Sequence, residues 1–309
     1  MPSPRLRHAH TLANLIAALA LPAAAHAVNL PTYPVTDPGP SSAAWYTDRY
    51  TPSGFADAGT LDGRDNVLAI SLSAADSQTS RPAAYSGAFY NTQGRKVDAG
   101  IAGPVSWIGS LYIPASWGTP SASDSSGSRR SDMWGTVSPA TGGDTCPASN
   151  CNLFPIIGFS NAVAPDANGA VGATPRFRVF DGNAGGWTDL AHTVNYDAWA
   201  DFCVTFTGTT IEYRIGDTLV YTMSDITPSD TSYGPPTQIG NVMAQAYNYG
   251  NAYDANWSRF AVGQATCSQL RAQVAPARIQ PSVPVPLGPL APLGAALAVA
   301  LLAARRLVR

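Results

Sequence analysis

Aromatic, amide and acidic side chains gather near the end of the chain in a pattern suited to sugar binding. Residues 245–257 interleave tyrosine with asparagine and aspartate. Aromatic rings pack on the apolar faces of sugars, while amide and carboxylate groups bond the hydroxyls. The alternative is that the tyrosines enter a core and the polar residues form turns. The predicted ligand-binding residues are Tyr247, Tyr249, Asn251, Tyr253, Asp254 and Asn256.

Closely spaced aspartate and asparagine oxygens also suggest calcium at two places. One is Asp181-Gly-Asn183, and the other is the acidic stretch 62–66. Calcium prefers such oxygen ligands. Neither segment has the fixed register of an EF-hand loop, so simple turns are the alternative. We name Asp181 and Asn183 as candidate metal ligands and Ca²⁺ as the one cofactor to test.

Residues for acid–base catalysis are scarce. The chain has one glutamate, Glu212, and His192 is the one histidine after residue 27. Glycosidases usually place two carboxylates about the scissile bond, and the nearest approach here is Asp197 and Asp201 on either side of Trp199. No Gly-x-Ser-x-Gly turn lies near His192. A non-catalytic protein is favoured, and a polysaccharide lyase or hydrolase using these residues is the alternative.

The charge balance excludes a nucleic-acid partner. The whole chain has a formal charge of −2, and removal of the arginines at its two ends leaves 13 basic residues against 20 acidic ones. Binding to phosphate backbones requires a basic face. We therefore expect a partner other than DNA or RNA.

The four cysteines predict disulfides, because all of them lie in the part expected to be exported. Four cysteines allow three pairings. Cys146 and Cys151 are close enough in sequence to close a short loop, which leaves Cys203 to pair with Cys267. We favour this pairing, since the spacings differ from those of structural zinc sites.

Short strands must position all these residues. Nineteen of the 20 acidic residues are aspartate, and lysine occurs once, a composition that disfavours helical surfaces. Residues 211–215 alternate apolar with polar side chains before the turn at Gly216-Asp217, which predicts a β-hairpin. Residues 119–132 are predicted to form a mobile loop. The strand candidates are residues 67–73, 88–90, 107–113, 155–160, 176–180, 202–207, 210–215, 219–223, 241–247 and 257–262.

So many short strands at close spacing favour an all-β sandwich. Within residues 170–265, a strand ending Phe180-Asp-Gly, a strand over 199–206, the hairpin over 211–221 and a last strand over 257–263 resemble the concanavalin A-like jelly roll. Laminin G modules, legume lectins and related glucanases have that fold. The resemblance implies the jelly roll and hints at carbohydrate binding. The Glu-x-Asp-x-x-Glu motif of the glucanases is absent.

The beginning of the chain reads as a secretory signal peptide. Two arginines precede an apolar stretch at 15–21, and Ala25-His-Ala27 forms a small-x-small cleavage site. We expect cleavage after residue 27, followed by an extended lead-in over 28–42 and a β-sandwich domain over 43–273.

The end of the chain reads as a membrane anchor. A proline-rich linker at 274–286 leads into residues 287–309, where 18 uncharged residues precede an arginine cluster. This tail resembles those of PEP-CTERM and IPTL-CTERM proteins, with Val285 in place of the acidic residue. The resemblance implies an exosortase-type sorting protease as a partner, and an ordinary transmembrane helix is the alternative. The whole chain predicts an exported bacterial surface or matrix protein that binds glycan or another extracellular polymer, or a purely structural envelope component.

Overall fold

The computed structural model describes residues 45–121, 127–140, 150–163, 172 and 174–274. The predicted signal peptide, lead-in and membrane tail lie outside the described residues, as does the linker beyond Val274. Among the residues that the structure describes, no helix has the length and apolar character needed to cross a membrane.

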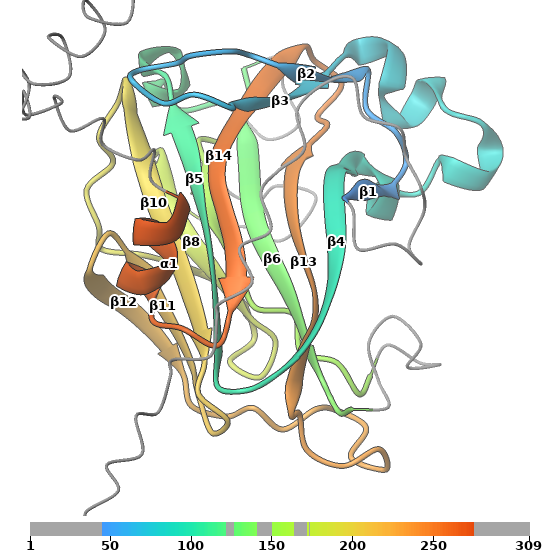
Figure 1. The fold of residues 1–309 in the computed structure, drawn as a ribbon. Coiled ribbons are helices and arrows are strands. Elements are labelled where there is room, and N and C mark those ends of the chain that lie inside the picture. Colours follow the sequence, from blue (N-terminus) through green and yellow to red (C-terminus); the bar gives the residue numbers. More distant parts are fainter. Residues whose placement is uncertain (1–44, 122–126, 141–149, 164–171, 173, 275–309) are drawn as a thin grey trace, which may run out of the picture. The chain divides into compact units, whose positions relative to one another are not determined.

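Strands are the main regular elements of the described chain (Figure 1). They are β1 (Tyr46–Arg49), β2 (Gly54–Asp57), β3 (Leu68–Leu72), β4 (Thr92–Ala102), β5 (Val105–Ile113), β6 (Arg130–Ser138), β7 (Ile156–Ser160), β8 (Arg176–Asp181), β9 (Gly186–Asp189), β10 (Ala198–Phe206), β11 (Ile211–Ile215), β12 (Thr218–Met223), β13 (Gln238–Tyr247) and β14 (Tyr253–Gly263). The helical elements are 3₁₀ turns η1 (Ala74–Asp76), η2 (Gln78–Ser80), η3 (Ala83–Tyr85), η4 (Ala88–Asn91) and η5 (Ala115–Gly118), and helix α1 (Cys267–Val274).

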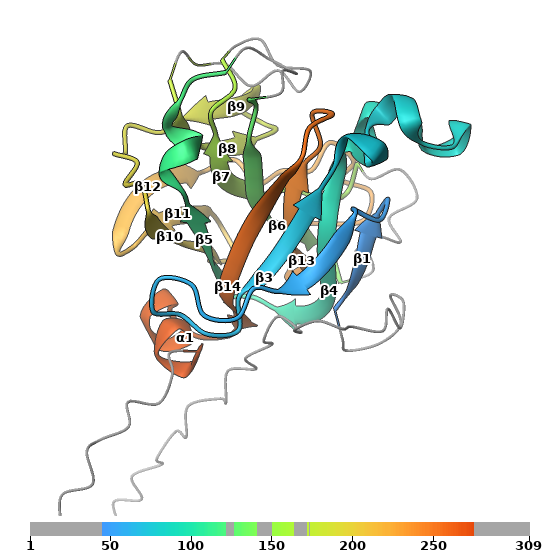
Figure 2. The same ribbon diagram turned by 90° about the horizontal axis from the view of Figure 1, so that it is seen from above.

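The strands form two seven-stranded antiparallel sheets that face each other (Figure 2). Sheet A has the order β1-β4-β13-β6-β7-β8-β9, and sheet B has the order β12-β11-β10-β5-β14-β3-β2. The predicted all-β sandwich is confirmed, and its arrangement is compatible with the jelly roll that the resemblance implies. The consecutive strands β13 and β14 belong to different sheets.

Alternating side chains fill the space between the sheets. In β11, Ile211, Tyr213 and Ile215 are buried while the residues between them are not, as the sequence predicts. Trp107 of β5 and Trp257 of β14 are fully buried in the same core. Each large side chain removed from water stabilises the fold by about 1.5–3 kcal/mol. The hairpin turn is also confirmed, since β11 and β12 pair across it and Gly216 adopts a left-handed φ of 57°.

Two sequence predictions are corrected by the structure. Residues 88–90, predicted as a strand, lie in the 3₁₀ turn η4, because the chain there has left the sheet and bonds locally from Tyr90 N–H to the Gly87 carbonyl. The mobile loop predicted at 119–132 is wrong at its end, because strand β6 already begins at Arg130 and this residue is buried. An ion pair between Arg130 and Asp132 makes that polar segment stable in the sheet.

Helix α1 lies against the outer face of sheet B and is tied to it by the predicted Cys203–Cys267 disulfide (Figure 1). Leu270 of α1 is buried against Ile108 and Ala261 of that sheet. Cys151 is buried and disulfide-bonded. Its predicted partner, Cys146, lies outside the described residues.

Candidate functional site

The predicted sugar-binding cluster is divided between the two faces of the sandwich. Tyr247 ends β13 on the outer face of sheet A, where its ring lies 5.0 Å from the Arg130 guanidinium. Asp254 and Asn256 lie on β14 in sheet B, at alternate positions that face away from the core. Because β13 and β14 lie in different sheets, six residues close in sequence do not form one surface.

The tyrosines of that cluster do not present free ring faces. Tyr247 and Tyr249 are buried against each other with ring centroids 4.6 Å apart. The Tyr253 hydroxyl donates to the Tyr247 carbonyl at 2.6 Å, and burial raises the pKa of Tyr253 well above its usual value. Asn251 is buried too and accepts a hydrogen bond from Arg129 at 2.9 Å. These residues hold the connection between the sheets together.

The predicted calcium ligands form a turn. The Asp181 Oδ1 atom accepts hydrogen bonds from the N–H groups of Asn183 and Ala184, and its Oδ2 atom accepts one from the Tyr221 hydroxyl at 2.9 Å. The Asn183 amide donates to two carbonyls of the loop after β12. Donors therefore already occupy both carboxylate oxygens of Asp181. Within the described ranges, no group of three or more His, Cys, Asp or Glu side chains lies close enough to hold a metal ion.

Of the residues considered for catalysis, His192 and Asp201 lie near each other, and Asp197 lies elsewhere. His192 and Asp201 line one depression of about 190 Å³ beside Trp199. The Asp201 carboxylate is bound by Arg64 at 2.8 Å and by the Ser110 hydroxyl at 2.5 Å.

Asp197 has a different hydrogen-bond partner from Asp201. Its carboxylate accepts a hydrogen bond from the Ala115 N–H at 2.8 Å, across the chain connections at one end of sheet B. The two aspartates therefore do not form a pair of free carboxylates.

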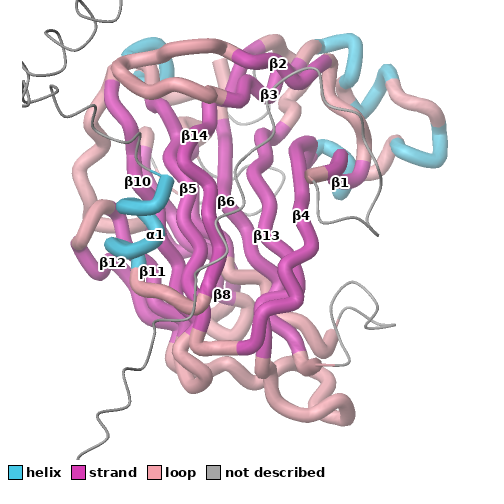
Figure 3. Tube along the Cα trace, viewed as in Figure 1, coloured by secondary structure: helices cyan, strands magenta, loops and turns pink. Residues whose placement is uncertain are grey.

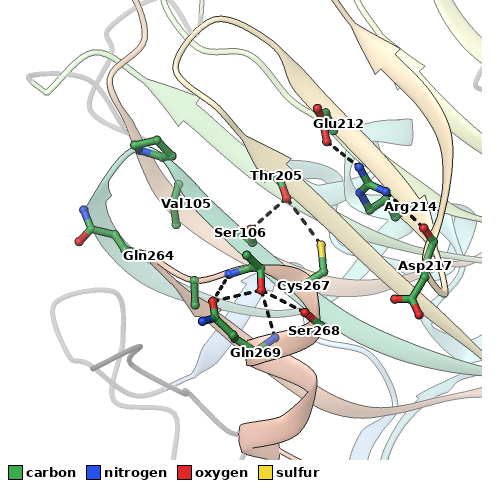
Figure 4. Close-up of a pocket in the computed structure, with 13 residues that line it drawn as sticks. Val105, Ser106, Thr205, Glu212, Arg214, Asp217, Gln264, Cys267, Ser268 and Gln269 are labelled. Carbon is green, nitrogen blue, oxygen red and sulfur yellow. Dashed lines mark hydrogen bonds and ion pairs between the residues drawn. The ribbon is translucent and has the colours of Figure 1, made fainter. Parts of the chain in front are cut away.

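A groove of about 600 Å³ lies on the outer face of sheet B, beside the first residues of α1 (Figure 4). Its charged side chains already have partners, since Glu212 pairs with Arg214 at 3.0 Å and Asp217 pairs with Arg271 at 2.7 Å. No aromatic side chain is among its lining residues. The groove therefore lacks the ring faces that sugar binding uses.

A second cleft, of about 420 Å³, lies on the outer face of sheet A and does have aromatic walls. We call it the sheet A cleft. It is lined by Arg49, Ala88, Phe89, Thr92, Arg130, Trp134, Phe154, Ile156, Phe180 and Trp187.

The floor of the sheet A cleft is a buried charge network. The Asp132 carboxylate is fully buried and lies 2.6 Å from Arg130 Nε and 3.9 Å from Arg178 Nη2. The Gln245 amide donates to the same carboxylate at 3.3 Å. Charges buried to this extent are stable only with partners. The network fixes the position of the Arg130 side chain, which lines the cleft.

The strand pairing explains how this network forms. Asp132 of β6 lies opposite Gly158 of β7, which in turn lies opposite Arg178 of β8. A Cβ atom on Gly158 would overlap the Asp132 carboxylate and the Ser131 carbonyl. Glycine between the two charged residues therefore lets Arg178 reach Asp132 across strand β7.

Two half-buried tryptophans form walls of the cleft. The Trp187 ring lies 3.8 Å from the Arg178 guanidinium and 4.8 Å from that of Arg130, so it covers part of the floor. On the other side, the Trp134 ring lies 4.7 Å from the Arg49 guanidinium. Stacking on arginine holds each ring at a fixed place in the cleft wall.

No protein-family model matches this chain, and neither does any curated protein. Solved structures do match. A sialidase overlaps 72% of this chain and only 17% of its own length, with TM-score 0.39 and 9% identity. A Bacillus licheniformis β-glucanase overlaps 79% of this chain and 100% of its own, with TM-score 0.39 and 9% identity. An alginate lyase in complex with an alginate trisaccharide overlaps 67% and 88%, with TM-score 0.40 and 9% identity. At such low sequence identities and TM-scores, these similarities indicate neither an activity nor a ligand for this chain.

The sheet A cleft is not predicted by the sequence patterns. The floor residues Arg130 and Asp132 lie in the segment predicted to be a mobile loop, and the wall residues Trp134 and Trp187 belong to strands that are distant in sequence. One local signal was present, because Arg176 and Arg178 alternate with buried Phe177 and Val179 in β8. That alternation places two arginines on the same outer face of the strand.

Proposed function

We propose that this protein binds an extracellular glycan in the sheet A cleft. The observation that carries the proposal is the pair of tryptophan walls, Trp134 and Trp187, beside a buried arginine–aspartate floor. Tryptophan faces pack on sugar rings, and guanidinium groups donate to hydroxyl or carboxylate oxygens. The ring surfaces and the fixed donors therefore suit a carbohydrate.

The floor chemistry favours binding without hydrolysis. Glycosidases of the usual kind require one carboxyl group as acid and another as base or nucleophile. Asp132 is buried in an ion pair, and the residues that line the cleft include no aspartate or glutamate. This arrangement suits a binding protein better than a hydrolase.

The test is saturable binding of defined polysaccharides. The purified full chain is titrated with β-glucan, arabinan and alginate, and screened on a glycan array with Ca²⁺ and again with chelator. We expect binding to one polysaccharide class, with a large loss in Trp134→Ala and Trp187→Ala. Trp199→Ala, a half-buried tryptophan on sheet B, is the matched control and should bind normally. No saturable binding by the folded protein would overturn the proposal in favour of a structural envelope component.

A polysaccharide-degrading enzyme is the second candidate, supported by the depression that His192 shares with Asp201 and Trp199. In that case, incubation with the same polysaccharides would release reducing ends or unsaturated products, and His192→Ala would stop the release. Product formation unaffected by His192→Ala would move the chemistry elsewhere.

We further propose that the protein is exported and held at the membrane by its C-terminal tail before any processing. The support is the signal-like segment 1–27 and the apolar stretch followed by arginines at 287–309. Sequencing of the mature N-terminus should begin at Val28, and truncation after residue 286 should release the protein from the membrane fraction. An intact N-terminus in the exported fraction would contradict this topology, and exosortase dependence would show as altered processing in a strain without that enzyme.

A further inference from the structure

The chain between β3 and β4 forms an arm of consecutive 3₁₀ turns beside the sandwich (Figures 1 and 3). We call residues 74–91 the aromatic arm. Turns η1 to η3 bury none of their own residues, and η4 buries only Asn91. The arm therefore contributes almost nothing to the core.

Polar contacts nevertheless give the arm a defined conformation. Arg81 Nε donates to the Asp76 carbonyl at 2.6 Å, and its guanidinium lies 5.1 Å from the Tyr50 ring. The Asn91 amide donates to the Tyr247 hydroxyl at 3.0 Å, which joins the arm to the outer end of β13. The arm is thus fixed in place without being needed to fill the core.

The arm presents aromatic rings to solvent. Phe89 is 63% exposed and Tyr85 is 39% exposed. Both lie against Tyr90, with ring centroids 5.3 Å and 5.1 Å from its ring. Contiguous exposed apolar surface on a soluble domain commonly marks an interaction site.

These rings continue directly from the sheet A cleft. Phe89 is itself one of the lining residues of the cleft. The Arg49 guanidinium lies between Phe89 and Trp134, at 4.3 Å and 4.7 Å from their ring centres. A row of contacting groups therefore runs from the cleft wall through Arg49 and Phe89 to Tyr90 and Tyr85, with Tyr90 edge-to-face against both of its aromatic neighbours.

We propose that the aromatic arm is an outer subsite for the same ligand, so that the ligand is a polysaccharide chain longer than the cleft. This inference rests on the proposed function. Sugar units inside the cleft would contact Trp134 and Trp187, a unit at its edge would pack on Phe89, and units beyond it would pack on Tyr85. Continuity with the cleft favours the same chain as occupant over a separate protein partner.

The test compares a polymer with its trisaccharide. The full chain and its variants are titrated by calorimetry with β-glucan, arabinan and alginate and with the trisaccharide of each. We expect Tyr85→Ala to weaken polymer binding by about 2- to 10-fold, the effect of one aromatic contact, and to leave trisaccharide binding unchanged. Tyr85→Phe keeps the ring and should bind both probes normally. Tyr233, which is 38% exposed at another place in the chain, provides the matched control Tyr233→Ala.

The outcomes separate this inference from the proposed function. If Tyr85→Ala leaves polymer affinity unchanged, or weakens the two probes equally, the outer subsite is overturned while binding in the cleft stands. A loss of polymer affinity in Tyr233→Ala equal to that in Tyr85→Ala would also overturn it. If none of the probes binds, or Trp134→Ala and Trp187→Ala bind normally, the proposed function fails and the outer subsite fails with it.

Discussion

The Asp132 carboxylate lies in the floor of the sheet A cleft, where water does not reach it. An isolated charge at such a place would be very unfavourable, and the arginine partners make it tolerable. The sequence shows Arg130 and Asp132 as two polar residues in a serine-rich stretch, which favours a loop. Their partners, Arg178 and Gln245, are far away in the chain. A buried network of this kind becomes visible only when the strands are placed.

Removal of the Asp132 carboxylate should therefore destabilise the protein strongly. We expect Asp132→Ala to lower the free energy of unfolding by about 3–5 kcal/mol, because Arg130 would be left buried without its counter-charge. Urea unfolding of the full chain measures the change. Glu212→Ala is the control, since Glu212 pairs with Arg214 at the surface and should cost less than about 1 kcal/mol. Equal losses in the two variants would contradict the buried ion pair.

The raised pKa of Tyr253 gives a prediction at alkaline pH. Burial favours the neutral hydroxyl, so this residue stabilises the fold fully below the unfolded pKa of about 10 and loses that contribution as the pH rises toward the folded pKa. Tyr253→Phe cannot ionise. Its free energy of unfolding should therefore fall less than that of the natural protein between about pH 9 and about pH 11. An identical decrease in both proteins would show that Tyr253 ionises as freely as in water.

At the scale of elements, regular apolar alternation was enough to find a strand. The hairpin of β11 and β12 was predicted nearly to the residue. Strands β4 and β6 were missed, because buried polar residues such as Gln93 and Arg95 interrupt the apolar pattern. The high strand propensity of Phe89 and Tyr90 predicts a strand in the arm between β3 and β4. Local hydrogen bonds instead form the 3₁₀ turn η4 there.

A disulfide joins helix α1 to sheet B. The Cys203–Cys267 bond closes a loop of 64 residues, and loss of such a cross-link typically costs about 2–4 kcal/mol. The double variant Cys203→Ser with Cys267→Ser should lose that much stability in urea unfolding. Amide hydrogen exchange should at the same time rise first in α1, which has only Leu270 buried. Unchanged exchange in α1 would mean that packing alone holds the helix.

At the scale of the whole molecule, the two sheets decide which residues can form a site. The sequence correctly predicted the sandwich and the Cys203–Cys267 pairing. It placed the ligand on residues 247–256, a segment that crosses from sheet A to sheet B and so has no single face. The sheet A cleft, where we propose that the ligand binds, combines β1, β4, β6, β7, β8 and β9 with the aromatic arm. Local patterns report alternation along one strand, whereas this site depends on neighbours across several strands.

The most direct test of the account is the affinity of Trp187→Ala for the polysaccharide that the natural protein binds. Trp187 borders the cleft and covers its buried floor, and Trp199→Ala removes a comparable ring from sheet B. We predict that Trp187→Ala loses about 10-fold or more in affinity, about 1.4 kcal/mol, while remaining folded. Trp199→Ala should bind as the natural protein does. Normal binding by Trp187→Ala, or an equal loss in Trp199→Ala, would contradict a glycan site in the sheet A cleft.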